Sequence, residues 1–210
     1  MARPQTVTDT AIVEAALEIM FEYGPGGLTF EKLGQRVGLV PAALVRRFST
    51  KRDLVRAADR FALKRSQERL DKVLAEHDAP IEAILAEFIA EKSFASTLDR
   101  FIHGEEFLLM DLADKDLYTN YRMSFQERHQ RVVEMLEKAK ARGELEANLN
   151  AEEIAQFLQM ILHGAGHVWA MDQKGSIDEY ITRYVLLALE PYRLDVKEGE
   201  NDEKRAEKII

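Results

Sequence analysis

The stretches LTFEKLGQRVGL (residues 28–39) and PAALVRRF (residues 41–48) decide the fold of the N-terminal part of the chain. Thr29 is a residue type that caps helix N-termini, and Gly38 is the type that most often ends helices. Pro41 stands where proline is tolerated, in the first turn of a helix. The sequence therefore predicts a helix through Val37, a turn of three residues and a second helix over 41–48. The lengths of the two helices and the residues that begin and end them are typical of a helix-turn-helix.

A helix is also predicted on each side of this motif. The preceding segment carries apolar residues at helical spacing and ends in Gly24-Pro25-Gly26-Gly27, which does not continue a helix. The following segment opens with Thr50-Lys51-Arg52-Asp53, which has the form of a capping box, and its helix is expected to run toward His77. We expect a small core made by the apolar residues Ile19, Leu33, Val37, Leu44 and Phe48.

The remaining sequence has helical periodicity as well. Capping and breaking residues delimit helices over approximately residues 80–94, 97–112, 117–141, 151–173 and 177–190. No segment alternates polar and apolar residues between hairpin turns, so the expected fold is all-α, with about nine helices and no sheet. We expect a helix-turn-helix domain over residues 1–55, a helical body over 56–195 and a charged, disordered tail over 196–210.

The composition is that of a globular chain without disulfides. Of the 210 residues, 46% are hydrophobic and 31% are charged, which suits a sizeable core beneath a polar surface. The absence of cysteine excludes disulfides, thiolate metal ligands and cysteine nucleophiles. No apolar run approaches the ~18 residues of a membrane span, and the first residues lack the apolar stretch of a secretory signal. We therefore expect a cytoplasmic protein that does not bind membranes.

The charge is divided unevenly along the chain, whose formal net charge is −8. Residues 1–65 carry 11 Lys and Arg against 7 Asp and Glu, a net of +4. The remaining 145 residues carry 18 against 30, a net of −12. A run of basic residues is often only a solvated helix face. A basic end joined to an acidic body is also expected where one part of a protein meets phosphate and the other does not.

The spacing of the helix-turn-helix alone leaves two interpretations open, DNA binding in the major groove and plain core packing. The wider pattern over about residues 9–60 resembles the N-terminal domain of TetR-family transcriptional regulators. That pattern reads approximately T-x-x-x-(I/L)-A-x-x-A-G-V-S-x-x-x-(L/I)-Y-x-(H/Y)-F-x-(S/N)-K-(E/D)-x-L. The chain matches it at Thr29, Leu33, Gly38, Leu44, Phe48, Lys51 and Leu54. The resemblance implies a DNA-binding regulator that is a homodimer and usually a repressor.

Val37, Leu39 and Thr50 are near matches, and the departures that bear on DNA contact lie at four other positions. Val40 replaces the serine before the recognition helix, and Val45 replaces a tyrosine that generally contacts phosphate. Arg47 stands at the His/Tyr position and Arg52 at the acidic position, so two hydroxyls are lost and two guanidinium groups are gained. Arg46 is the leading candidate for reading a base edge, and Lys51 with the helix N-terminus behind it is expected to hold a phosphate. The expected DNA-binding residues are Thr29, Pro41, Ala42, Ala43, Val45, Arg46, Arg47 and Lys51.

The acidic body is rich in helix-borne aromatic residues and methionine. Most such side chains form a core, but the resemblance implies that some of them enclose a pocket for a small apolar or amphipathic effector. Tyr121, Phe125 and His129 share one helical face and are expected to form a wall of it. The expected ligand-binding residues are Phe101, Met110, Tyr121, Phe125, Phe157, His163 and His167.

His163 and His167 are spaced i, i+4, which allows two imidazoles to bind one metal ion. The H-E-x-x-H glutamate is missing, because the residues between them are Gly164-Ala165-Gly166. Pocket lining and interface packing are the other interpretations, and the glycines favour packing because they let another helix approach closely. We expect no metal and no cofactor.

The last two predicted helices, over 151–173 and 177–190, are apolar on more than one face. A surface helix needs only one apolar stripe, so the second face must be covered. The resemblance implies a dimer interface in which two copies form a four-helix bundle. A two-fold axis there predicts a near-palindromic operator with half-sites ~34–36 Å apart. The expected interface residues are Ala165, Trp169, Tyr184, Leu187 and Ala188.

Enzymatic activity is not expected. The chain has no G-x-S-x-G and no glycine-rich phosphate loop after a strand. His103 and Glu106 are spaced i, i+3, which is equally an ordinary contact on a helix surface. The expected function is a repressor that a small effector releases from double-stranded DNA. The alternative, kept open by Val40, Val45 and the Ala42-Ala43 pair, is a ligand-binding or protein-interaction module with a degenerate recognition helix.

Overall fold

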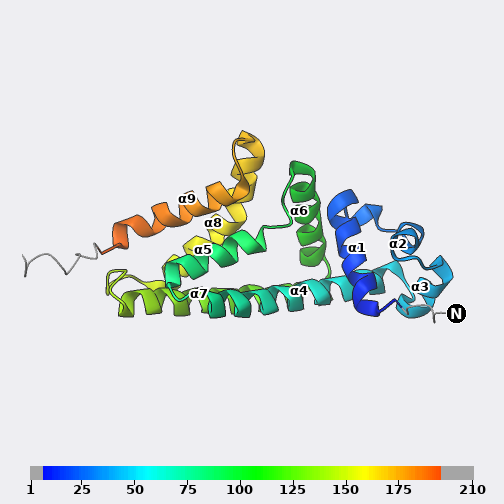
Figure 1. The fold of residues 1–210 in the computed structure, drawn as a ribbon, viewed down its shortest axis with the longest axis horizontal. Coiled ribbons are helices and arrows are strands. Elements are labelled where there is room, and N and C mark those ends of the chain that lie inside the picture. Colours follow the sequence, from blue (N-terminus) through cyan, green and yellow to red (C-terminus); the bar gives the residue numbers. More distant parts are fainter. Residues whose placement is uncertain (1–6, 195–210) are drawn as a thin grey trace, which may run out of the picture.

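A computed structural model describes residues 7–194 of the chain (Figure 1). These residues form nine α-helices and no β-strand, with one isolated antiparallel bridge between Leu145 and Arg193. The prediction of an all-α fold with about nine helices is therefore confirmed. The tail predicted over 196–210 lies outside the described residues, and the division of the chain at residue 55 remains a prediction.

The N-terminal end of the molecule consists of α1 (Asp9–Tyr23), α2 (Phe30–Val37), α3 (Pro41–Phe48) and the start of α4 (Lys51–Glu76) (Figure 1, right). Thr29 caps α2 by accepting a hydrogen bond from the Lys32 N–H, and Gly38 ends that helix with a left-handed φ of 69°. Val40 gives α3 no side-chain cap. Pro41 at the start of α3 has no N–H to satisfy, which lessens the need for one.

The body consists of α5 (Pro80–Glu91), α6 (Leu98–Ala113), α7 (Lys115–Ala141), α8 (Ala151–Asp172) and α9 (Ile177–Leu189). α4, which is about 39 Å long, and α7 run side by side along the molecule, whereas α6 packs against α1 (Figure 1). Two helix boundaries differ from those expected from the sequence. α5 stops before Phe94, whose ring stacks on Phe21 at 4.9 Å between centroids, and α7 begins earlier because Asp114 caps it.

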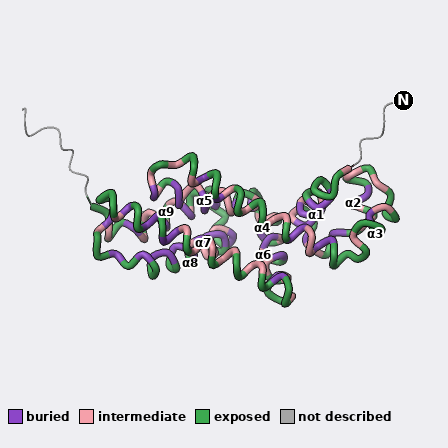
Figure 2. The backbone as a smooth tube through the Cα atoms, turned by 90° about the horizontal axis from the view of Figure 1, so that it is seen from below, coloured by how far each residue is buried: buried purple, intermediate pink, exposed green. Residues whose placement is uncertain are grey.

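Two apolar clusters hold these helices together, and Figure 2 shows the buried stretches along each helix. In the N-terminal cluster Ile19, Leu33 and Leu44 are fully buried, as predicted, whereas Val37 and Phe48 pack against it and remain partly exposed. This cluster also contains Phe107 of α6 and Leu117 of α7. The second cluster joins α5, α7, α8 and α9 through side chains such as Phe88, Leu136 and Leu158. The body is thus packed directly into the N-terminal end.

Candidate DNA-binding site and effector cavity

α3 exposes one face that carries most of the predicted DNA-binding residues. Leu44 points into the core and is fully buried, while Pro41, Ala42, Val45 and Arg46 are exposed. Ala43 is half-buried, and Val40, at the start of the helix, is 68% exposed. The structure therefore brings the α3 candidates together on a surface free to meet another molecule.

The predicted cationic residues differ in how the fold already uses them. Arg47 donates from Nη1 to the Val7 carbonyl oxygen at 2.7 Å and to Asp9 Oδ1 at 3.2 Å, tying α3 to the start of α1. Lys51 Nζ donates to the Gly26 carbonyl oxygen at 3.3 Å. Arg46 forms no ion pair with any residue between 7 and 194. Arg46 is thus the guanidinium on α3 that is available to DNA.

Arg52 occupies a position that the sequence suggested for an added phosphate contact. Its Nη2 instead donates to Asp114 Oδ2 at 2.7 Å, which joins α4 to the start of α7. This hydrogen bond lowers the pKa of Asp114 below its ordinary value. The expected replacement of lost hydroxyls by guanidinium groups is therefore weaker than the sequence indicated, because the chain's own carboxylates already pair with Arg47 and Arg52.

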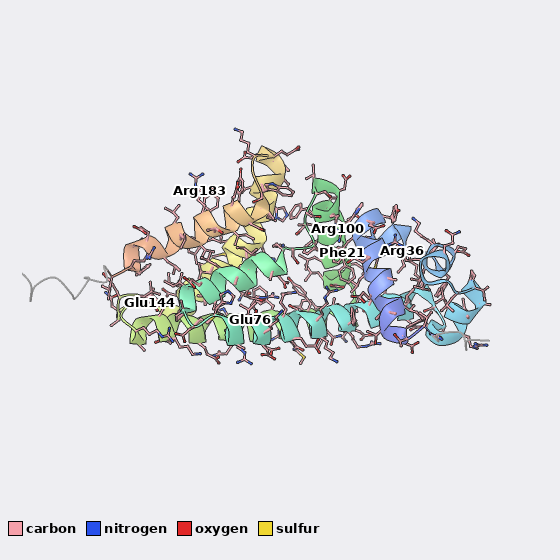
Figure 3. All side chains as sticks on the ribbon, in the orientation of Figure 1. Phe21, Arg36, Glu76, Arg100, Glu144 and Arg183 are labelled. Atoms are coloured by element: carbon pink, nitrogen blue, oxygen red, sulfur yellow. The ribbon has the colours of Figure 1, made fainter. Side chains whose placement is uncertain are left out.

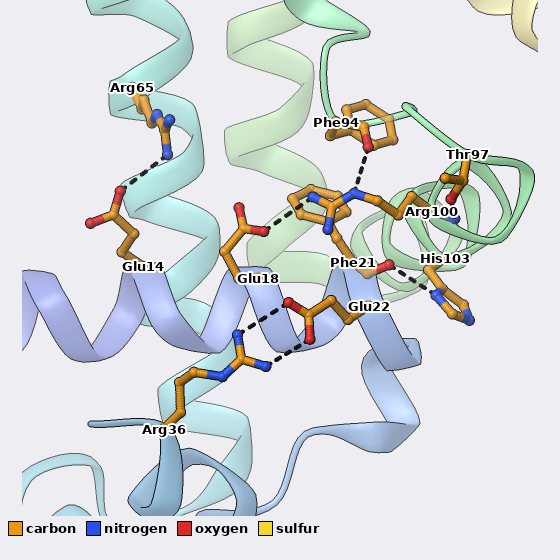
Figure 4. A network of polar contacts seen from close by, with 10 residues as sticks. All are labelled: Glu14, Glu18, Phe21, Glu22, Arg36, Arg65, Phe94, Thr97, Arg100 and His103. Atoms are coloured by element: carbon orange, nitrogen blue, oxygen red, sulfur yellow. Dashed lines mark hydrogen bonds and ion pairs between the residues drawn. The ribbon is translucent and has the colours of Figure 1, made fainter. Parts of the chain in front are cut away.

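α1 is joined to α6 by a network of polar contacts (Figure 4). Arg100 of α6 donates from Nη2 to Glu18 Oε2 at 3.1 Å and from Nε to the Phe94 carbonyl oxygen at 2.8 Å. Its guanidinium lies 5.6 Å from the centroid of the Phe21 ring, and both side chains lie between α1 and α6 (Figure 3). His103 Nδ1 donates to the Phe21 carbonyl oxygen at 2.9 Å. The last turn of α1 is thus fixed to α6.

The same helix is tied to the helix-turn-helix on its other side. Arg36 of α2 donates from Nη1 and Nη2 to the two carboxylate oxygens of Glu22, at 3.1 and 2.7 Å (Figure 4). This two-point contact lowers the pKa of Glu22. Because α1 contacts both α2 and α6, it connects the helix-turn-helix with the body.

A cavity of about 590 Å³ lies beside this connection. Glu18 and Phe21 of α1 form part of its wall, as does Arg100 of α6. The wall is completed by residues of α4, α5, α6 and α7, by Leu17 of α1, by residues 92–94 between α5 and α6, and by His163 of α8. Its volume falls in the range of small-molecule sites, ~300–1,000 Å³.

Three of the seven predicted ligand-binding residues line the cavity, namely Tyr121, Phe125 and His163. His163 stacks on Phe125 with ring centroids 6.0 Å apart, and burial, followed by the charge of Lys92, lowers the pKa of His163 to about 4. The imidazole is therefore neutral near pH 7.

The other four predicted residues are not part of the cavity wall. Phe101 belongs to the core of the body, and Met110 packs against the N-terminal cluster. Phe157 is 44% exposed, and the side chain of His167 is 60% exposed. His129, expected on the same wall as Tyr121, instead lies with Nε2 2.8 Å from Glu152 Oε2.

The two histidines of α8 do not converge. His167 turns its Nδ1 to the His163 carbonyl oxygen at 3.0 Å, while its Nε2 lies 3.6 Å from Glu105 Oε2. Between residues 7 and 194, no three His, Asp or Glu side chains are grouped so that they could hold a metal ion.

Two buried carboxylates in the cavity wall were not predicted from the sequence. Asp59 of α4 and Asp111 of α6 are 1% and 4% exposed. The signal available in the sequence was an acidic residue within an apolar helical stripe, such as Asp59 beside Ala58. That pattern does not show whether the residue faces a partner, solvent or a cavity.

Comparison with known proteins identifies the family of the N-terminal domain. Residues 12–58 match the family model described as bacterial regulatory proteins, tetR family. This domain belongs to the TetR family. The resemblance found in the helix-turn-helix motif is therefore confirmed, and the domain is of the DNA-binding type. No curated protein sequence matches the chain.

Solved structures extend the TetR likeness to the fold of the whole chain. A TetR transcription regulator from Haloarcula marismortui is 18% identical with a TM-score of 0.74, covering 89% of this chain and 98% of that one. A protein from Saccharomonospora viridis in complex with choline is 16% identical with a TM-score of 0.75, covering 90% and 100%. SmeT, the repressor of the Stenotrophomonas maltophilia multidrug efflux pump SmeDEF, is 18% identical with a TM-score of 0.66, covering 91% and 93%. The chain thus has the fold of TetR-type regulators.

The far end of this TetR-type fold presents an apolar surface on α8 and α9. Leu187 is 61% exposed and Met160 is 58% exposed, with Phe157, Val168 and Met171 also exposed. Among the predicted interface residues, Trp169, Tyr184 and Ala188 are half-buried, and Ala165 is buried within the chain. Across residues 7–194, none of the helices combines the length and the apolar character that crossing a membrane requires.

Proposed function

We propose that the chain is a homodimeric repressor that binds a specific DNA sequence and is released from it by a small molecule in the cavity. The observation that carries this proposal is that the cavity wall includes Glu18 and Phe21, which lie on a helix of the TetR-type DNA-binding domain. A molecule in the cavity therefore touches the domain that meets DNA.

The coupling follows from the contacts of α1. A ligand shifts an equilibrium only if it binds two conformations with different affinity. A ligand that displaces Phe21 or Arg100 alters the network that fixes α1 to α6, and with it the position of α2, which Arg36 holds to α1. DNA must in turn weaken ligand binding by the same factor.

We assign the DNA contacts to the exposed face of α3 and the helix starts beside it. Arg46 is the candidate for direct reading of a base edge, because it is free of ion pairs among the described residues. Pro41, Ala42, Ala43 and Val45 offer only apolar contact, which suits thymine methyl groups. Thr29, Arg47 and Lys51 are candidates for phosphate contacts, which position the domain without specifying sequence.

We propose that α8 and α9 form the dimer interface. Exposed apolar side chains on both helices, including Leu187 and Met160, would be covered there. The two-fold axis would repeat the recognition helix, so the DNA site should be a near-palindrome.

The descriptions of two similar structures support the repressor and small-molecule parts of the proposal. SmeT is by its description a repressor, and the Saccharomonospora viridis protein is described in complex with choline. A regulator of this kind acts in the cytoplasm and needs no enzymatic activity, and we propose both for this chain.

Selection of bound duplexes from a random library tests the proposal. We expect a near-palindromic sequence to be enriched, and Arg46→Ala to lose that enrichment while Arg122→Ala, at an exposed position on α7, keeps it. No enrichment by the unmodified protein would favour the second candidate, a binding module with a degenerate recognition helix. Val40, exposed in place of a capping serine, is the observation that favours that candidate.

A further inference from the structure

We propose that the cavity binds a protonated organic amine with an apolar body, whose ammonium group is held by Asp59 and Asp111. This inference rests on the proposed function only in so far as it assigns a ligand to the cavity. Some charged side chains of the cavity wall already form ion pairs, and others do not. The unpaired ones indicate which charge a ligand should carry.

Each cationic residue of the wall already has a carboxylate partner. Lys92 lies 3.6 Å from Glu105, Arg100 pairs with Glu18, and Arg65 pairs with Glu14. Arg69 and Arg128 both pair with Glu91. An anionic ligand would have to break one of these pairs, so the wall does not favour an anion.

Asp59 and Asp111 are the exceptions among the carboxylates of the wall, since neither forms an ion pair with any described residue. Asp59 Oδ2 and Asp111 Oδ1 are buried and accept no hydrogen bond from the part of the chain that the structure describes. A buried acceptor without a donor is costly, and a buried carboxylate without a counter-charge is more so.

The pKa values of the two carboxyl groups are raised, as expected for buried carboxyls without a counter-charge. Burial, with the charges of Asp59 and Asp114, raises the pKa of Asp111 to about 8. Burial also raises the pKa of Asp59 to about 6, against the smaller opposing effect of the Asn120 side chain. An ammonium group would supply both the missing charge and the missing N–H donors. Binding it should therefore ionise Asp111 and release a proton.

The rest of the wall suits an apolar body attached to that ammonium group. The wall that contains Asp59 and Asp111 also contains three aromatic and two aliphatic side chains, namely Phe107, Tyr121, Phe125, Leu63 and Leu108. Aromatic faces also attract cations. A quaternary ammonium carries charge but no N–H donor, and a metal ion needs more ligands than two carboxylates supply, so an amine fits the unsatisfied oxygens best.

Calorimetric titration with three probes of one shape tests the inference. The probes are 1-naphthylmethylamine, 1-naphthylmethanol and 1-naphthoate. We expect the amine to bind about 10-fold or more tightly than the other two, as a charge-assisted pair predicts. Its binding enthalpy should depend on the ionisation enthalpy of the buffer, because a proton is released.

The variant Asp59→Asn/Asp111→Asn should lower the affinity for the amine about 10-fold or more and leave that for the alcohol unchanged. Asp99→Asn, on an exposed part of α6, is the matched control and should change neither. Equal binding of all three probes, preference for the carboxylate or absence of amine binding at millimolar concentration would overturn the inference. These outcomes for the unmodified protein do not depend on how the variant folds.

DNA release is measured in a separate experiment. The proposed release mechanism and the proposed ligand class can therefore be contradicted by different results. Amine binding without any effect on DNA would contradict the proposed release mechanism and leave the ligand class standing. Release of DNA by a neutral or anionic compound, with no amine binding, would leave the mechanism standing and refute the ligand class.

Discussion

His103 Nδ1 donates a hydrogen bond to the Phe21 carbonyl oxygen at 2.9 Å, which joins the middle of α6 to the last turn of α1. The contact lies between the body and the TetR-type domain, beside a cavity that Phe21 itself lines. It gives the two parts a directional connection in addition to apolar packing, and such a connection is what a ligand in the body would have to alter.

We predict that His103→Leu weakens the coupling between ligand and DNA more than it weakens DNA binding. Coupling energies typically correspond to about 5–150-fold changes in affinity, and we expect that ratio to fall toward one in this variant. The check is the DNA affinity with and without a molecule that releases DNA from the unmodified protein. His77→Leu, which removes an imidazole hydrogen-bonded to the Val73 carbonyl oxygen at the end of α4, serves as control. Unchanged coupling in His103→Leu would rule out this contact as part of the connection.

The raised pKa of Asp111 predicts an unusual dependence of stability on pH. Between its ordinary value of 3.8 and about 8, the folded state holds a proton that the unfolded state has lost. The free energy of unfolding should therefore fall as pH rises through that interval, by up to about 1.4 kcal/mol per pH unit for one group. In Asp111→Asn the fall should be smaller. Urea unfolding at pH 5, 7 and 9 measures it, and parallel curves for the two proteins would contradict the prediction.

Arg46 and Lys51 should contribute differently to DNA binding. Arg46→Ala should weaken the binding free energy by about 1–3 kcal/mol on the selected sequence and change it little on random duplex, because a contact to a base edge distinguishes one sequence from another. Lys51→Ala should weaken binding to both duplexes to a similar degree, because a phosphate contact positions the domain on DNA without reading its sequence. Affinities measured by fluorescence anisotropy on the two duplexes decide between these roles. A uniform loss in Arg46→Ala would reassign that residue to the backbone.

Leu187→Arg should yield a folded monomer. Leu187 is 61% exposed within one chain, so an arginine there is tolerated by the fold, but it would become an unpaired buried charge at a dimer interface. Met123→Arg on α7, at a position 63% exposed, is the matched control and should leave the dimer intact. Sedimentation velocity distinguishes the two. A dimer that survives Leu187→Arg would place the interface elsewhere.

Local signals in the sequence were sufficient for the helices of the N-terminal domain. Thr29, Gly38 and Pro41 act within one turn of their own positions, so they mark the bounds of α2 and α3 without knowledge of the rest of the chain. Helix type and approximate length in the body were likewise readable from periodicity and capping residues.

The cavity could be predicted only in part, because its wall depends on how distant helices pack. Tyr121 and Phe125 share a face of α7 that meets the cavity, whereas Phe157 of α8 is 44% exposed and lies outside the cavity wall. Asp59 and Asp111 are 52 positions apart in the sequence. Their placement in one wall arises from the packing of α4 and α6 around the cavity, which no local pattern encodes.

The salt dependence of DNA binding tests the central claim most directly. We predict that the unmodified protein binds its selected duplex as a dimer and that log K falls linearly with log salt concentration. The slope should correspond to several phosphate contacts, with about 0.9 per phosphate neutralised. Lys51→Ala should reduce this slope by about one for each phosphate that the lysine neutralises. Affinity that is absent, or that does not change between 50 and 200 mM salt, a range over which phosphate contacts cost about 10³–10⁵ in affinity, would contradict a DNA-binding function.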